Sequence, residues 1–354
     1  MKLRNVATFG SLTLGAFGLG LAVKSFLPQH LATESPTIRR AQLIGVTTAV
    51  AAPPIDGAGA SFATEALELE KTQQPSTFPE IDINFLRCGS TTIPTCIAVR
   101  GASLFTSCVI AYSAVLVRHP KASFLYDTGL CSDIYLYLAD QPLLFRKTLA
   151  NFVFEQSLTG HLQHHGLRPT DIDFALISHL HWDHVSGIPD IPGVLLRINR
   201  VEYDAARLGL LDANHALVRQ LLCDNPLEFF DCADKSYAGF RSSHDLFGDG
   251  SIILVPLPGH TAGNTGMFIH RSNGSPLFLL GDAAWVAQNY LRPATMHPIV
   301  WRLVTSDDAT ARQTLIDLHH FSLSHPHIPS IAMHDAEMQE KIMALEHPHV
   351  STPQ

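Results

Sequence analysis

One short segment of the sequence concentrates residues that can bind metal ions. Residues 179–184 read His-Leu-His-Trp-Asp-His, so four of the six are candidate ligands. In an extended chain alternate side chains share one side, which predicts that His179, His181 and Asp183 converge while His184 points toward a second spot nearby. Neutral imidazole is the commonest metal ligand in proteins. A lone histidine is more often a core or surface residue, but this density of ligands predicts metal chemistry.

Three further candidates each follow an apolar run. His260 lies in Pro-Gly-His-Thr-Ala-Gly at 258–263, Asp282 closes Leu-Phe-Leu-Leu-Gly-Asp at 277–282, and His334 follows Ile-Ala-Met at 331–333. Taken alone, Asp282 would also suit a helix N-cap and His334 a loop histidine. Together with the first segment they supply five histidines and two aspartates. That set suits two divalent ions that share a carboxylate and keep open positions, which is the condition for metal-assisted hydrolysis.

The elements that must position these residues alternate between short β-branched runs and longer helical patterns. We expect helices over 143–164, 201–211 and 307–321. We expect strands over 81–86, 108–117, 123–126, 174–177, 252–255, 265–269, 277–280 and 330–333. Neighbouring strands of hairpin type with flanking helices favour sheet packed on sheet and covered by helices, rather than one doubly wound sheet.

These motifs closely resemble the metallo-β-lactamase superfamily. The resemblance covers roughly residues 80–340 and rests on five strings, which are FLYDTG at 124–129, HLHWDH at 179–184, PGHTAGN at 258–264, LLGDAAW at 279–285 and MHD at 333–335. It implies an α+β fold, the αββα sandwich of the metallo-β-lactamase type. It also implies that Asp127 orients a ligand imidazole, although turn preferences explain that residue equally well. The implied ligands are His179, His181 and His260 for the first metal, Asp183, His184 and His334 for the second, and Asp282 as the bridge.

Within the superfamily the chain is most similar to the N-acyl-homoserine lactonase group. The retained Asp282 argues against the classes without a bridging carboxylate, which include the true zinc β-lactamases. In the lactonases a tyrosine that contacts the substrate carbonyl lies three residues after the bridging aspartate, and here that position is Trp285. Trp285 is therefore expected in the substrate pocket, either as a hydrogen-bond donor through its indole N–H or as part of the pocket wall. Tyr290 is the residue expected to replace the phenol of the lactonase tyrosine.

The resemblance implies a dinuclear metal-dependent hydrolase that opens lactone or ester bonds of small molecules, N-acyl-homoserine lactones among them. A metal-bridging hydroxide would attack the carbonyl and Asp183 would carry the proton to the leaving alkoxide. The two ions are expected to be zinc, with manganese, cobalt and iron as alternatives. The alternatives for function are a thioester hydrolase of the glyoxalase II type, a phosphodiesterase, and a non-catalytic metal-binding protein.

The amino-acid composition indicates which classes of binding partner to expect. The chain has 354 residues, 24 Lys and Arg against 32 Asp and Glu, a net charge of −8 and 20 histidines. The acidic balance and the absence of a basic segment count against a nucleic-acid partner. A hydrophobic content of 46% excludes low-complexity disorder and provides a sizeable core. Oligomeric state is left open.

The N-terminal part resembles a targeting segment. Lys2 and Arg4 precede an apolar stretch over 6–23, and Arg39-Arg40 precedes a short apolar run that ends in Ala-Val-Ala at 49–51, as in a twin-arginine signal. We expect a targeting or anchor segment over 1–52, a linker over 53–79 and the catalytic domain over 80–354. The protein is thus expected to be exported to the periplasm or medium, or tethered to the membrane, with a cytoplasmic protein as the alternative.

The six cysteines form no CxxC pair, so a zinc knuckle or a thioredoxin-like site is not expected. Cys88 with Cys96 and Cys223 with Cys232 are near enough in sequence to bridge in an oxidising compartment. Packed free thiols explain them equally well.

Overall fold

The computed structural model describes residues 78–208, 215–222 and 224–346 as two β-sheets with helices on their outer faces. The first sheet has seven strands in the order β4-β1-β2-β3-β5-β6-β7, and the second has five in the order β12-β11-β10-β9-β8. The strands of the first sheet are β1 (Asp82–Pro94), β2 (Ser107–His119), β3 (Ala122–Tyr126), β4 (Val153–Phe154), β5 (Phe174–Ile177), β6 (Leu195–Asn199) and β7 (Leu227–Phe230). Those of the second are β8 (His244–Asp245), β9 (Ile252–Pro256), β10 (Thr265–Ile269), β11 (Leu277–Leu279) and β12 (Ser330–Ile331).

Strand direction brings several strand ends to one edge of the structure. In the first sheet β3, β5, β6 and β7 run parallel, and in the second β12 runs parallel to β11. The register pairs Tyr126 with Leu176, and Leu279 with Ile331. Residues that follow β3 and β5, or β11 and β12, therefore emerge side by side.

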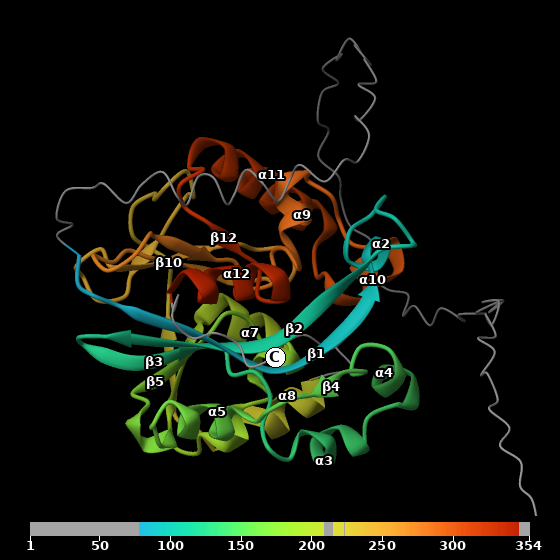
Figure 1. Ribbon diagram of the computed structural model, residues 1–354, viewed down its shortest axis with the longest axis horizontal. Helices are drawn as coiled ribbons and strands as arrows, with labels where there is room; N and C mark the ends of the chain where they lie inside the picture. Colours follow the sequence, from blue (N-terminus) through green and yellow to red (C-terminus); the bar gives the residue numbers. More distant parts are fainter. Residues whose placement is uncertain (1–77, 209–214, 223, 347–354) are drawn as a thin grey trace, which may run out of the picture. The chain divides into compact units, whose positions relative to one another are not determined.

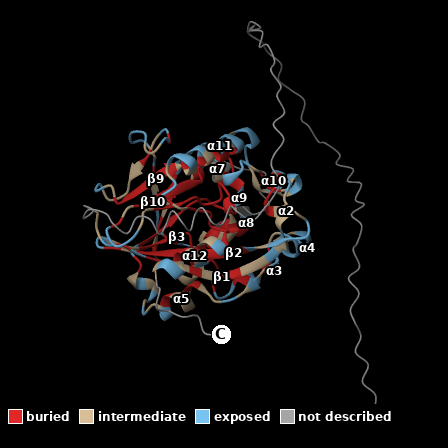
Figure 2. Ribbon diagram, turned by 45° about the horizontal axis from the view of Figure 1, so that its top comes forward, coloured by how far each residue is buried: buried red, intermediate tan, exposed pale blue. Residues whose placement is uncertain are grey.

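The core between the sheets follows from the period of two along each strand. In β5, Phe174 and Leu176 face the second sheet, whereas Ala175 and Ile177 face the helices. In β9, Ile252 and Leu254 likewise face the first sheet. Both faces of these strands are buried, which explains why they consist of unbroken apolar runs rather than alternating ones. Figure 2 shows the strands as buried and the outward faces of the helices as exposed.

Helices cover the outer face of each sheet. α3, α5 and α8 pack on the seven-stranded sheet and α9, α10 and α11 on the five-stranded sheet (Figure 1). The helices are α2 (Thr95–Ala98), α3 (Ile134–Ala139), α4 (Leu143–Lys147), α5 (Leu158–His164), α6 (Trp182–Val185), α7 (Arg200–Leu208), α8 (His215–Leu222), α9 (Ala287–Leu291), α10 (Pro298–Val304), α11 (Asp308–Ser324) and α12 (Ala336–Glu346). The predicted αββα sandwich is confirmed.

The expected helix over 143–164 is wrong. The structure divides this stretch into α4, the short strand β4 and α5, with Val153 paired to Ser90 of β1. Ser157 caps α5 by accepting a hydrogen bond from the Gly160 amide at 3.1 Å, so a helix start lies inside the apolar pattern. Strands β6 and β7 and helix α8 were not expected, and the expected strand over 330–333 ends at Ile331.

Several expectations lie outside the described residues. The targeting segment, nearly all of the linker, Cys223 and the end of the helix expected over 201–211 are among them. The domain boundaries stay predictions. The described cysteines are free thiols, so Cys88 and Cys96 form no disulfide. Among the described helices, none is long and apolar enough to cross a membrane.

Candidate metal centre

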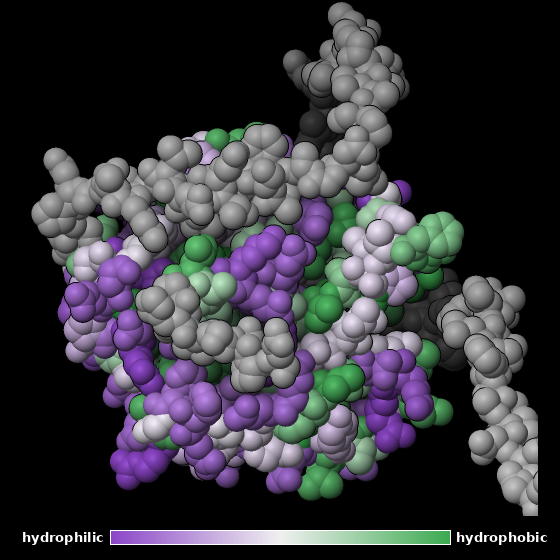
Figure 3. Space-filling view, in the orientation of Figure 1, coloured by the Kyte–Doolittle hydropathy of each residue, from purple (hydrophilic) through white to green (hydrophobic). Residues whose placement is uncertain are grey.

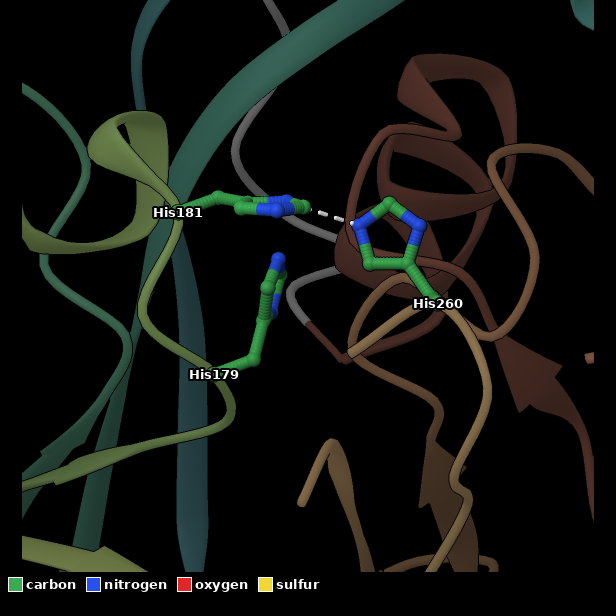
Figure 4. Close-up of side chains that lie close together, drawn as sticks. All are labelled: His179, His181 and His260. Carbon is green, nitrogen blue, oxygen red and sulfur yellow. Dashed lines mark hydrogen bonds between the residues drawn. The ribbon is translucent and has the colours of Figure 1, made fainter. Parts of the chain in front are cut away.

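Three histidines from the two sheets form the first ligand group. His179 and His181 follow β5 of the seven-stranded sheet, and His260 follows β9 of the five-stranded sheet. Each offers a ring nitrogen within 4.8 Å of the others. His181 Nδ1 lies 2.9 Å from His260 Nε2, and Figure 4 shows the three rings gathered around one point.

Asp183, His184 and His334 form the second group, again with ligand atoms within 4.8 Å of one another. His334 Nε2 lies 3.4 Å from Asp183 Oδ2. The simple alternation expected along 179–184 is therefore wrong for Asp183. The chain is extended only to His181, which is the N-cap of α6, and the turn of α6 carries Asp183 and His184 together to the second group.

Asp282 lies between the two groups. Its Oδ2 is 3.3 Å from His260 Nε2 and 3.1 Å from His334 Nε2, while its Oδ1 is 3.2 Å from His184 Nε2. One carboxylate thus faces ligands of both groups. Asn264 fixes its backbone, because the Asp282 amide donates to Asn264 Oδ1 at 3.1 Å.

Burial and charge set the protonation of this cluster. Burial lowers the pKa of His179 and of His260 well below 6.5, which keeps both imidazoles neutral. Burial also opposes protonation of His184 and His334, but the Asp282 carboxylate raises the pKa of both. The cluster therefore holds neutral imidazoles on one side and attracts positive charge on the other, as a cation site requires.

The side chains fit divalent metal ions. His179 Nε2, His184 Nε2 and Asp282 Oδ1 are buried without a hydrogen-bond partner. Unpaired buried polar atoms are costly, and here they converge with other imidazole and carboxylate donors. Imidazole and carboxylate are ligands that zinc and other first-row divalent metals accept.

Asp127 supports the second group. Its Oδ2 lies 2.7 Å from His184 Nδ1, and Oδ1 accepts a hydrogen bond from the Ser178 amide at 2.7 Å. A carboxylate on the ring nitrogen remote from the metal fixes the orientation of an imidazole ligand. Asp127 has a φ of +57°, a left-handed conformation that aspartate tolerates better than most residues.

Trp285 and Tyr290 differ in their contacts with the ligand cluster. Trp285 Nε1 donates to Asp282 Oδ2 at 3.0 Å, and its ring packs edge-on against His334 with centroids 5.5 Å apart. Tyr290 does not join the metal side chains, because its hydroxyl donates to the Ser330 carbonyl at 2.7 Å and its ring belongs to the core outside the second sheet.

Sequence reasoning missed two residues beside the ligands. Tyr112 of β2 packs edge-on against His334 with ring centroids 5.8 Å apart. Burial first, and then the carboxylates of Asp183 and Asp282, raise its pKa, so the phenol stays neutral. Glu202 of α7 is buried and bonds to both loops that carry the first ligand group. An aromatic residue in a strand and a glutamate in a first helical turn are common, and neither gave a signal.

The loop between α2 and β2 exposes apolar side chains. Leu104 is 65% and Phe105 98% exposed in this loop. Figure 3 shows hydrophobic surface on the side where Figure 1 shows α2 and α10. The adjoining cluster of Ala98, Val99, Ile110 and Val286 packs against Trp285. Apolar side chains of α2, β2 and the segment before α9 thus pack against the indole that contacts Asp282.

The fold and the ligand cluster define a protein of the metallo-beta-lactamase fold. The family model described as the metallo-beta-lactamase superfamily matches residues 109–195, from β2 to the start of β6 and including the segment 179–184. The resemblance found in the sequence, to that superfamily and to its lactonases, is confirmed by the relatives below.

Two of these relatives are N-acyl homoserine lactonases called AttM. The chain is 26% identical to the one from Agrobacterium fabrum over 165 residues, which are 46% of this chain and 55% of that protein. It is 28% identical to the one from Azorhizobium caulinodans over 183 residues, 49% of this chain and 65% of that protein. The chain thus matches between about half and two thirds of their length.

Solved structures agree on the fold. A quorum-quenching N-acyl homoserine lactone lactonase superposes with a TM-score of 0.56 at 16% identity, over 76% of this chain and 97% of that one. An N-acyl homoserine lactone hydrolase with the product N-hexanoyl-L-homoserine at its catalytic metal centre superposes with a TM-score of 0.57 at 16% identity. The superposition covers 75% of this chain and 97% of that one.

Proposed function

We propose that this protein is a dinuclear metal-dependent hydrolase that opens lactone and ester bonds, with N-acyl homoserine lactones as its substrates. The observation that carries the proposal is the position of Asp282 between two three-residue ligand groups. One group alone would also suit a structural metal ion, whereas two groups that share a carboxylate suit a reaction centre.

The ligand roles follow from this geometry. His179, His181 and His260 would hold the first ion, Asp183, His184 and His334 the second, and Asp282 would bridge them. When bound, the two ions supply Lewis acidity toward a carbonyl and lower the pKa of water. We propose zinc for both positions.

Asp183 is the proposed proton carrier. Its side chain is 14% exposed, more than the 4% of His334 or the 3% of Asp282. It is thus the carboxylate of the cluster with the most access to substrate and solvent. In that position it can hold a proton and pass it to the leaving alkoxide.

Two features support an acylated lactone as the substrate. The named relatives are N-acyl homoserine lactonases, and Leu104 and Phe105 expose apolar surface that an acyl chain can contact. Trp285 departs from the tyrosine of that group, and its N–H is engaged by Asp282. Substrate orientation must therefore come from other groups, and Tyr112, whose ring packs against His334, is the candidate phenol.

A side-by-side assay tests the proposal. The purified protein is analysed for bound metal and offered N-hexanoyl homoserine lactone, an aryl ester, a glutathione thioester and a phosphodiester. We expect turnover of the lactone, loss of turnover after chelation and recovery with Zn²⁺. Turnover of the phosphodiester or the thioester alone would replace the lactonase assignment. Metal binding without hydrolysis of any substrate would make the protein a metal-binding protein.

A further inference from the structure

Glu202 lies at the point where the two halves of the first ligand group meet. It is 3% exposed and stands in the first turn of α7. Its Oε1 accepts a hydrogen bond from the Leu180 amide at 2.8 Å, and its Oε2 accepts one from the Gly263 amide at 2.8 Å. Leu180 stands between His179 and His181, and Gly263 is three residues beyond His260. One carboxylate thus joins the two loops that supply the first group.

The loops joined by Glu202 come from different sheets. Residues 179–181 follow β5 of the seven-stranded sheet, and residues 260–263 follow β9 of the five-stranded sheet. A backbone hydrogen bond from Thr265 to the Ser178 carbonyl, 3.0 Å long, also links them, but at the strand end below the ligands. At the level of the imidazoles His181 Nδ1 lies 2.9 Å from His260 Nε2, and Glu202 adds two hydrogen bonds to the backbone of both loops.

The position of Gly263 shows how closely α7 packs against the loop that carries His260. A Cβ on Gly263 would lie 2.4 Å from the Glu202 amide nitrogen and 2.7 Å from its Cα, closer than real Cβ contacts allow. A glycine is therefore needed there to let the helix come near enough for its carboxylate to reach both amides. A buried carboxylate with two backbone N–H donors is a strong, charge-assisted arrangement, and it fixes both loops relative to α7.

A different buried carboxylate, Asp127, contacts the second ligand group directly. Asp127 bonds to His184 and to Ser178, and Glu202 bonds to neither. Asp127 contacts His184 of the second group directly and reaches His179 of the first group only through the Ser178 hydroxyl, which lies 2.8 Å from Asp127 Oδ2 and 3.0 Å from His179 Nδ1. Glu202 bonds only to the backbone of the loops that carry the first group.

We propose that Glu202 is a positioning residue for the first metal ion, because it sets the separation of His179 and His181 from His260. This inference rests on the proposed dinuclear centre. Without the carboxylate the two loops would keep their folds, but nothing would fix the distance between them through α7. The first ion would then bind more weakly than the second.

Cobalt binding tests this division. The full-length protein and its Glu202→Gln variant are stripped of metal, titrated with Co²⁺, and followed by the visible absorption of the bound ion and by the bound-metal ratio. Glutamine keeps the size of the side chain but can accept from only one of the two amides. We expect one of the two Co²⁺ equivalents to bind about tenfold or more weakly and the other to be unchanged, since each lost bond was charge-assisted.

Asp190→Asn is the matched control. The Asp190 side chain also accepts hydrogen bonds from two backbone amides, those of Ser132 at 3.0 Å and Thr159 at 2.9 Å, and neither residue lies in a loop that carries the proposed ligands. The Asp190→Asn substitution should lower the melting temperature of the protein and leave both Co²⁺ affinities unchanged. Glu202→Asp, in which the shorter carboxylate reaches only one amide, should reproduce the Gln result and provides a second variant if Gln folds poorly.

Three outcomes would overturn the proposal. They are unchanged Co²⁺ affinities and spectrum in both Glu202 variants, equal weakening of both equivalents, and the same weakening in Asp190→Asn. Wild-type protein that binds two Co²⁺ ions and hydrolyses no lactone or ester would overturn the proposed function, while the Glu202 result would still stand or fall by its own titration.

Discussion

Both carboxylate oxygens of Asp282 face imidazole nitrogens. Oδ2 faces His260 and His334, and Oδ1 faces His184. The indole N–H of Trp285 also reaches Oδ2, so the carboxylate is held from a third side. We therefore expect the metal affinity and turnover of the centre to be most sensitive to Asp282 and to the groups that orient it.

Asp282→Ala is expected to lower metal content and turnover together. Loss of an outer partner of a metal ligand already costs about 10–100-fold in affinity or activity, so removal of a shared ligand should cost about 100-fold or more. Elemental analysis and lactone turnover measure the two effects, with the exposed Asp140→Ala as the control. Full metal content and rate in Asp282→Ala would contradict a dinuclear centre.

Trp285→Phe removes one hydrogen bond to Asp282 and keeps an aromatic ring against His334. Since a hydrogen bond to a charged group is worth about 1.5–3 kcal/mol, we expect metal affinity to fall at least about tenfold. Trp301→Phe is the matched control, because the Trp301 indole donates to Asp308 away from the ligands. Equal metal affinities in both variants would show that the Trp285 bond does not hold Asp282.

The loop that carries His260 depends on how α11 and the segment before it are packed. The Ser306 amide donates to the His260 carbonyl at 2.8 Å, and a Cβ on Gly259 would lie 2.2 Å from the Ala311 amide nitrogen. Gly259 also has a φ of +122°, which other residues rarely adopt. The position of His260 is thus set by a helix that begins almost fifty residues later in the chain.

Gly259→Ala is expected to destabilise the protein by about 3 kcal/mol or more, from backbone strain and overlap with α11 together. Gly193→Ala is the control, because Gly193 has a φ of +78° but open space around its Cβ position. It should cost about 1 kcal/mol. Denaturant unfolding measures both, and equal costs would show that α11 tolerates the added methyl group.

Acid should destabilise the protein through one buried and two half-buried histidines remote from the metal ligands. Burial lowers the pKa of His119, His161 and His270 below 6.5, and each also has a hydrogen-bonded ring nitrogen. A histidine whose pKa is lowered in the folded state binds its proton preferentially when unfolded. Its contribution is therefore present above about pH 6.5 and is lost as the pH falls below that value.

We expect the free energy of unfolding to drop between pH 7 and 5, by up to about 1.4 kcal/mol per pH unit for each such histidine. Urea unfolding across this range measures the slope. A His119→Gln variant keeps a polar side chain without a titrating ring and should show a shallower slope. An unchanged slope would mean that His119 takes up no extra proton on unfolding.

Export is the remaining whole-molecule prediction, and it rests on the sequence alone. If Arg39-Arg40 begins a twin-arginine signal, the chain should be found outside the cytoplasm, and replacement of both arginines by lysine should retain it inside. Cell fractionation of the two proteins measures this. If the protein with both arginines intact stays in the cytoplasm, the prediction is contradicted.

The sequence by itself determined the fold class and the ligand candidates. Unbroken apolar runs such as 174–177 marked strands buried on both faces, and a ligand at the end of such a run stands at a sheet edge by geometry alone. His179, His181, His260, Asp282 and His334 were all recognisable in this way, since each stands close behind an apolar run.

Only the tertiary structure decided how those residues are grouped and held. Alternation placed Asp183 with His179 and His181, but the chain turns into α6 after His181 and carries Asp183 to His334. Glu202 and Tyr112 gave no local signal, because their partners lie at least 20 residues away in sequence. Spacing along the chain identifies donors that share a strand end, whereas the contacts that orient them are made between segments that only packing brings together.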